Sequence, residues 1–194
     1  MELLKERIRR EGKVLPGNII KVDGFLNHRV DTKLLNDIAD EFARYFDVSK
    51  ITTVLTAEAS GIALATVCAQ RFGVPMLFAK KAKSDNIESG LYQSEVFSYT
   101  YKKKVTLLVS QEWLSAKDHV LIIDDFMANG FAMQGLVDIV NAAGATLEGI
   151  GVAVEKGFQG GGDKFRAMEG VRYKALAVIE KADENGIIFR EDEE

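Results

Sequence analysis

The sequence contains very little cysteine, proline or histidine. Among its 194 residues are one cysteine, two prolines and two histidines. The single cysteine, Cys68, excludes an internal disulfide, and the two histidines, His28 and His119, are too few and too far apart to suggest a metal site. With two prolines and no serine-rich stretch, nothing marks a linker, so we expect one domain over residues 1–194.

Long apolar runs and an excess of positive charge are also missing. No stretch approaches the ~20 apolar residues that a membrane-spanning helix needs, and the amino-terminal MELLKERIRREG has no apolar segment typical of a secretory signal. We therefore expect a cytoplasmic protein with no membrane partner. The net charge is -4 and the basic residues are scattered apart from Lys102–Lys104, so nucleic acid is not an expected partner either.

The chain does contain a regular alternation of apolar strands and amphipathic helices. This alternation predicts an α/β fold with a mostly parallel central sheet flanked by helices, and ligands at the carboxyl ends of its strands. The expected helices are Leu3–Arg10, a helix capped by Asp31 with an apolar face ending at Phe46, Gly61–Phe72, Phe131–Ala143 and Asp163–Met168. The expected strands are Ile19–Asp23, Ile51–Thr56, Pro75–Ala79, Leu91–Thr100, Val105–Ser110, Val120–Ile123, Ile150–Val154 and Tyr173–Ile179.

The most informative motif is VLIIDDFMANGFA at residues 120–132. A buried strand leads into two carboxylates, Asp124 and Asp125, and then into a turn of small residues before a helix. Backbone N–H groups in such a turn, together with the helix amino terminus, can bind a phosphate without a basic side chain. Adjacent carboxylates can accept hydrogen bonds from vicinal sugar hydroxyls or metal-bound water. The motif thus predicts a site for a phosphorylated ribose; the alternative is a pair of solvated or capping carboxylates.

Four apolar residues, two acids, two apolar residues and Ala-Asn-Gly together resemble the signature of type I phosphoribosyltransferases, which binds PRPP (5-phospho-α-D-ribose 1-diphosphate). Residues 25–28, 58–63 and 154–159 (FLNH, EASGIA and VEKGFQ) are similar to segments of the Bacillus-type xanthine phosphoribosyltransferases. The resemblance covers nearly the full chain. It implies the type I phosphoribosyltransferase fold with a small amino-terminal hood, to which residues 1–30 contribute, and a flexible β-hairpin loop.

The resemblance also implies a role for individual residues at the PRPP end of the site. Asp124 and Asp125 would be the catalytic pair that holds the ribose hydroxyls. The pyrophosphate would meet backbone N–H groups of the turn Ala57–Gly61, which includes Ser60, and the cation of Lys81, while Lys80 and Lys83 of the same run are more simply solvated. The 5′-phosphate would lie in a cradle formed by Ala128, Asn129, Gly130, Phe131 and Ala132.

At the base end, Lys156 would donate to the exocyclic O6 of a purine. Because an ammonium group can only donate, this contact would select oxopurines against adenine. Asn27 would contact the base through its amide and Ile20 through its backbone or by packing, and Phe126 or Phe158 could stack on the ring. The alternative for Lys156 is a surface lysine paired with Glu155.

The implied reaction converts xanthine and PRPP to xanthosine 5′-monophosphate and pyrophosphate. Mg²⁺ would arrive with PRPP and have no direct protein ligand, and closure of the Ser84–Tyr101 region would exclude water. Relatives selective for hypoxanthine and guanine carry an aspartate, the proton acceptor, at the position of Ala128. Since xanthine is more acidic, we expect it to react as its anion. Relatives form homodimers, so a homodimer is expected here.

Three other functions share parts of this pattern. A hypoxanthine or guanine phosphoribosyltransferase is the nearest alternative. A PRPP-sensing regulator, like the effector domain of the purine repressor, would need a DNA-binding module, and too little chain precedes Asp31 to form one. A dinucleotide-binding protein is suggested by Gly149-Ile-Gly151, but these glycines lead into a predicted strand rather than a helix.

Overall fold

The computed structural model describes residues 1–82, 90–98, 103–183 and 186–191. The expected polar loop Ser84–Ser89, Lys83 and Tyr101 lie outside the described residues.

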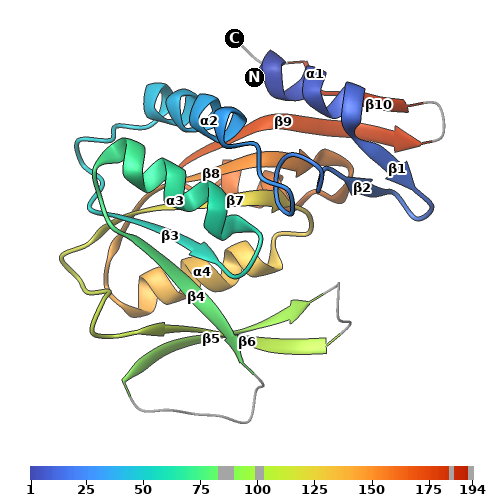
Figure 1. Ribbon diagram of the computed structural model, residues 1–194. Coiled ribbons are helices and arrows are strands. Elements are labelled where there is room, and N and C mark those ends of the chain that lie inside the picture. Colours follow the sequence, from blue (N-terminus) through green and yellow to red (C-terminus); the bar gives the residue numbers. More distant parts are fainter. Residues whose placement is uncertain (83–89, 99–102, 184–185, 192–194) are drawn as a thin grey trace.

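A single large sheet runs through the centre of the molecule (Figure 1). Its strand order, within the described chain, is β10-β9-β8-β7-β3-β4-β6-β5. The strands from β9 to β4 along this order pair in parallel, and β10, β6 and β5 are added antiparallel. This confirms the predicted mostly parallel α/β sheet. The strands are β3 (Thr53–Ala57), β4 (Met76–Ala82), β5 (Leu91–Ser98), β6 (Lys103–Ser110), β7 (His119–Met127), β8 (Thr146–Lys156), β9 (Arg172–Asp183) and β10 (Gly186–Phe189).

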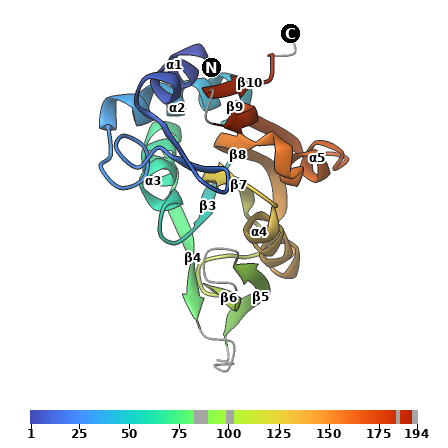
Figure 2. The same cartoon turned by 90° about the vertical axis from the view of Figure 1, so that its right-hand side faces the viewer.

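Helices cover both faces of the sheet (Figure 2). One apolar core lies between the sheet and α1, α2 and α3, and it includes the packed thiol of Cys68. The second core lies under α4 and α5. In the described part of the chain no helix is long and apolar enough to cross a membrane. The helices are α1 (Glu2–Glu11), α2 (Thr32–Tyr45), α3 (Gly61–Phe72), α4 (Phe131–Ala142) and α5 (Gly161–Arg166), with a short 3₁₀ turn, η1 (Gly157–Gln159).

Two short strands, β1 and β10, were not predicted. β1 (Lys13–Leu15) pairs in a small separate hairpin with β2 (Ile19–Lys21), which lies within the predicted strand Ile19–Asp23. β10 pairs with β9 at the edge of the large sheet. Each is three or four residues long, too short for an alternating pattern to stand out from its surroundings. In Figure 1 the β1–β2 hairpin lies on the same side of the molecule as the arrowheads of β7 and β9. The hairpin is therefore close to the edge where ligands of parallel sheets bind.

The predicted cap and apolar face of α2 are confirmed. Asp31 precedes the helix, and its Oδ1 accepts a hydrogen bond from the backbone N of Leu34 at 3.1 Å. This contact satisfies one of the N–H groups that a helix leaves unpaired at its first turn. All five apolar residues of the expected face are buried in the first core; they are Leu34, Leu35, Ile38, Phe42 and Phe46.

Two glycines of β8 allow this helix to pack closely on the sheet. A Cβ added at Gly149 would lie 2.6 Å from Cε1 of Phe46, and one at Gly151 would lie 3.0 Å from Cε1 of Phe42. Both glycines are inside the strand rather than in a turn before a helix. Their role is close packing, and the dinucleotide-binding alternative fails.

Replacing Gly151 by alanine tests this packing. The new methyl group would meet Ile123 Cδ1 at 2.7 Å as well as Phe42, and both side chains are fully buried, so they would have to shift within a packed core. We expect Gly151→Ala to lower the free energy of unfolding by about 1–3 kcal/mol, measured by urea denaturation. Gly24→Ala is the control, because no atom lies within 4 Å of its added Cβ. An equal loss in the two variants would contradict the packing argument.

Candidate active site

The two predicted carboxylates lie near the carboxyl end of β7, in the middle of the sheet. Asp124 is 8% exposed and Asp125 is 3% exposed. β7 continues through both residues to Met127 instead of ending at Ile123 as predicted. The sequence pattern underestimated the length of β7 because aspartates rarely occupy buried strand positions. The exception marks a site at which two polar groups are held out of water.

Asp125 is hydrogen-bonded on both of its oxygens. Nδ2 of Asn27 donates to Oδ2 at 2.6 Å, and Oγ of Ser60 donates to Oδ1 at 3.0 Å. These two donors come from the amino-terminal segment and from the turn before α3, so one carboxylate joins three distant parts of the chain. Ser60 and Asn27, predicted at opposite ends of the substrate, are thus brought to the same group.

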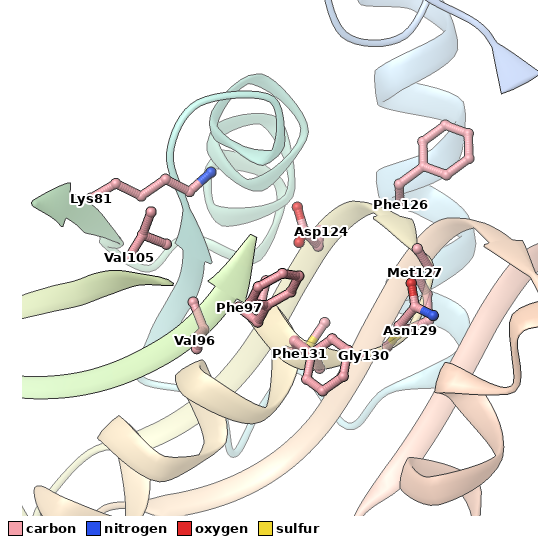
Figure 3. Close-up of a pocket in the computed structure, with 13 residues that line it drawn as sticks. Lys81, Val96, Phe97, Val105, Asp124, Phe126, Met127, Asn129, Gly130 and Phe131 are labelled. Atoms are coloured by element: carbon pink, nitrogen blue, oxygen red, sulfur yellow. The ribbon is translucent and has the colours of Figure 1, made fainter. Parts of the chain in front are cut away.

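Asp124 faces a cavity of about 200 Å³ (Figure 3). The ammonium group of Lys81 and the carboxylate of Asp124 approach this space from opposite sides. Of the predicted site residues, the cavity wall includes Asp124, Lys81, Ala128, Asn129, Gly130, Phe131 and Ala132. It does not include Asp125, Ser60, Asn27, Ile20 or Lys156.

The predicted phosphate turn has the geometry of an anion cradle. Gly130 has a left-handed φ of 81° and caps the amino terminus of α4. At this position a side chain would be strained, and an added Cβ would lie 3.0 Å from Cε2 of Phe165. The first N–H groups of a helix have no intrahelical acceptor, and a helix amino terminus at a cavity, as α4 has here, is suited to an anion.

Burial raises the pKa of the Asp124 carboxyl well above its ordinary value, and the neighbouring charge of Asp125 raises the pKa further, while Lys81 opposes the shift. The packing beneath Asp124 is tight. Oγ1 of the buried Thr56 has no hydrogen-bond partner, and a Cβ at Gly61 would overlap both this oxygen and Oδ1 of Asp124. A glycine is therefore required where α3 begins.

The turn Ala57–Gly61 lies between β3 and α3, as predicted, and the peptide bond Glu58–Ala59 is cis. Glu58 attaches this turn to β4. Its backbone N donates to the carbonyl of Ala79 at 3.0 Å, and its Oε1 accepts from the backbone N of Lys81 at 2.5 Å. The pyrophosphate turn and Lys81 are thereby held together, a contact that nothing in the sequence pattern indicated.

Of the predicted base contacts, Phe126 lines the cavity, whereas Ile20, Asn27, Lys156 and Phe158 lie outside its wall. Lys156 is the last residue of β8; it is half-buried, its Nζ lies 5.8 Å from the ring centroid of Phe126, and burial lowers its pKa. The alternative pairing with Glu155 is wrong, because Glu155 binds Arg166 and Tyr173 instead. Ile20 lies in β2 and is buried in the first core, and Phe158 is exposed in η1.

The β5–β6 hairpin, part of which belongs to the Ser84–Tyr101 region expected to close over the site, lines the cavity. Val96, Phe97 and Val105 come from this hairpin. The hairpin packs closely against helix α4, because Gly135 leaves room for Val96. An added Cβ at Gly135 would lie 3.0 Å from Cδ1 of Leu107. Among the described residues no group of three or more histidine, cysteine or acidic side chains is arranged to hold a metal ion.

A buried acid pair with one carboxylate in a cavity, beside a glycine-containing turn at a helix amino terminus and a lysine, at the carboxyl edge of a parallel sheet, is typical of phosphoribosyl-binding proteins. The phosphoribosyl transferase domain model matches residues 25–178, and the chain belongs to this family. Among solved structures, adenine phosphoribosyltransferase from Trypanosoma brucei shares the fold, with a TM-score of 0.72, 21% identity, and coverage of 90% of this chain and 78% of that one.

Curated relatives are more similar in sequence. Xanthine phosphoribosyltransferase from Lachnoclostridium phytofermentans is 50% identical over 194 residues, which cover 99% of this chain and 100% of the relative. The enzyme of the same name from Bifidobacterium longum is 52% identical, with coverage of 98% and 100%. The resemblance to this family that the motifs indicated is confirmed.

The raised pKa of Asp124 predicts a pH-dependent effect of Asp124→Asn. An unfolded chain ionises this aspartate near pH ~4, whereas the folded protein keeps the proton to higher pH, so ionisation costs stability as the pH rises above ~4. Without ligand, we expect the variant to match the wild type near pH 4 and to exceed its free energy of unfolding by at least about 1 kcal/mol at pH 7.5, measured by urea denaturation.

Asp118 provides a control of opposite sign. Although burial acts to raise its pKa, hydrogen bonds from Ser115, Thr53 and Thr52 lower it overall. Ionised Asp118 therefore adds to the free energy of unfolding above pH ~4, and this contribution is lost on acidification. Asp118→Asn should thus destabilise the protein at pH 7.5. If Asp124→Asn also destabilised at that pH, the burial argument for Asp124 would be wrong.

Proposed function

We propose that this protein transfers the phosphoribosyl group of PRPP to xanthine, giving xanthosine 5′-monophosphate and pyrophosphate. The observation that carries the proposal is the convergence of Asp124, the turn Ala128–Ala132 and Lys81 on one cavity. The similarity to curated xanthine phosphoribosyltransferases over the full chain supports the choice of base. A homodimer stays a prediction from the resemblance, and a cytoplasmic location stays a prediction from the sequence.

Each part of PRPP has a chemically suitable partner. The N–H groups of Ala128–Ala132 and the amino terminus of α4 suit the 5′-phosphate. Asp124 and Asp125 accept the hydrogen bonds of the ribose hydroxyls, and Asp124 gains by this contact because it is buried with few partners. The pyrophosphate lies between the turn Ala57–Gly61 and Lys81, which places a cation where negative charge develops.

The oxygen donors at this edge also suit Mg²⁺, which prefers carboxylate, phosphate and water oxygens. Asp124 and Asp125 would hold it through water molecules or through the ribose hydroxyls, with no direct protein ligand. When bound, the ion neutralises charge on the departing pyrophosphate.

We place the base between the amino-terminal hood, residues 1–30, and the end of β8. Lys156 donates to O6, and Asn27, which already contacts Asp125, stands between the base and the ribose. Ile20 contributes packing from β2. The reaction breaks the bond between the anomeric carbon and the pyrophosphate oxygen and forms one from that carbon to a purine nitrogen, whose lone pair is supplied by the xanthine anion.

The direct test is pyrophosphate release from PRPP and Mg²⁺ with xanthine, guanine, hypoxanthine, adenine and orotate at equal concentration. We expect the largest kcat/KM for xanthine and a rise with pH through the ionisation of xanthine. Preference for hypoxanthine or guanine would support the alternative phosphoribosyltransferase. Binding of PRPP without turnover of any base would support the sensor.

Lys156→Met tests the base contact separately. Loss of a hydrogen bond to a charged donor costs about 1.5–3 kcal/mol, so kcat/KM for xanthine should fall roughly 10-fold to 100-fold. Lys174→Met is the matched control, because the ammonium of Lys174 also lies over an aromatic ring, 5.2 Å from the centroid of Tyr45. Equal activity of the two variants would remove Lys156 from the base site.

A further inference from the structure

A fully buried carboxylate lies directly before Lys156 in the chain. Glu155 is 0% exposed, and three donors satisfy it. Nη1 of Arg166 donates to Oε1 at 2.9 Å, Nη2 of the same guanidinium donates to Oε2, and the hydroxyl of Tyr173 donates to Oε2 at 2.8 Å. A buried ion pair of this kind is weak evidence for stability, since apolar residues of similar volume often serve as well. Stability therefore does not explain why a buried ion pair lies at this position.

Glu155 and Lys156 point to opposite faces of the sheet, because successive side chains alternate along a strand. The carboxylate of Glu155 meets Arg166 of α5, whereas the ammonium of Lys156 lies over Phe126, which packs against the first core. Because the Glu155 carboxylate is held on one face of the sheet, the direction in which the Lys156 side chain points on the other face is fixed as well.

The same carboxylate supports the helix that lies against the phosphate turn. An added Cβ at Gly162 would overlap the Glu155 carboxylate, so the backbone of α5 rests directly on it. An added Cβ at the preceding residue, Gly161, would overlap the carbonyl oxygen of Ala128 and lie 2.7 Å from the backbone N of Gly130. Two consecutive glycines thus place α5 between the carboxylate and the phosphate turn with no space to spare.

We propose that Glu155, Arg166 and Tyr173, here called the Glu155 cluster, form a positioning device that sets the phosphate turn and Lys156 relative to each other. The cluster touches neither substrate. It acts through α5 on the turn and through the strand end on the lysine, which are the two ends of the nucleotide product. The inference rests on the proposed function, because that function assigns the phosphate to the turn and the base to Lys156.

The cluster predicts a particular pattern of binding losses. A ligand that spans both ends depends on their separation, whereas PRPP engages only the phosphate end. Loosening the cluster should therefore weaken the binding of xanthosine 5′-monophosphate more than the binding of PRPP. It should also lower kcat with xanthine, since misplacement by ~1 Å far from the chemistry can cost ~100-fold in rate.

Arg166→Lys and Tyr173→Phe are suitable variants. The first keeps the positive charge beside Glu155 but loses the two-pronged contact, and the second removes one donor and is the milder change should Arg166→Lys fail to fold. Arg71→Lys is the matched control, because Arg71 pairs with Asp40 at 2.5 Å on the surface between α3 and α2, far from the proposed site residues. Calorimetry measures binding of both ligands, with urea denaturation as the check of folding.

We expect both cluster variants to lose roughly 10-fold or more in affinity for xanthosine 5′-monophosphate and less than about 3-fold for PRPP, with kcat reduced and the control unchanged. Unchanged affinities, or equal losses for the two ligands, would overturn the positioning role. If the wild type turned over no base yet bound both ligands, the proposed function would fail while the calorimetry still decided on the cluster. A wild type that bound neither ligand would overturn both.

Discussion

Burial of two adjacent carboxylates at the end of β7 is the constraint around which the site is organised. Charged oxygens removed from water are costly unless donors replace the lost hydration. For Asp125 the donors are Asn27 and Ser60, and they draw the amino-terminal segment and the turn before α3 onto the central strand. The hydrogen bonds that satisfy Asp125 thus also bring together the two segments that we propose to contact the base and the pyrophosphate.

Asp124 has fewer hydrogen-bond partners than Asp125. It accepts from the backbone N of Asp125 at 2.9 Å and otherwise faces the cavity above a buried threonine hydroxyl that has no partner. Burial therefore raises its pKa, and the free protein is less stable than it would be with a satisfied side chain. In the proposed function a ribose hydroxyl would donate the missing hydrogen bond, so the binding of the sugar would recover the stability that the unsatisfied side chain costs the free protein.

Much of this arrangement could be predicted from the sequence, because it depends on local patterns. Helical periodicity placed α2 and its cap at Asp31, and the run before Asp124 located the central strand. The contacts that could not be predicted join residues distant in the chain. The Glu58 contact with β4 has no local signal, and the hairpin was expected near the site without the side chains, such as Phe97, that line the cavity. The pairing of Glu155 with Lys156, given as the alternative for that lysine, fails because the partner of Glu155, Arg166, is defined only by the packing of α5.

The charge of Lys156 connects the structure to the chemistry of the base. Burial alone lowers its pKa, and no carboxylate contributes to the shift, because Glu155 is engaged on the opposite face. A half-buried ammonium with no counter-ion among the described residues is stabilised by an anionic ligand. In the proposed reaction the xanthine anion would supply that charge, and the proton acceptor missing at Ala128 would be unnecessary, since the base would arrive already deprotonated. The pairing of Glu155 with Arg166 would thus leave Lys156 to select both the oxygen and the charge of the proposed substrate.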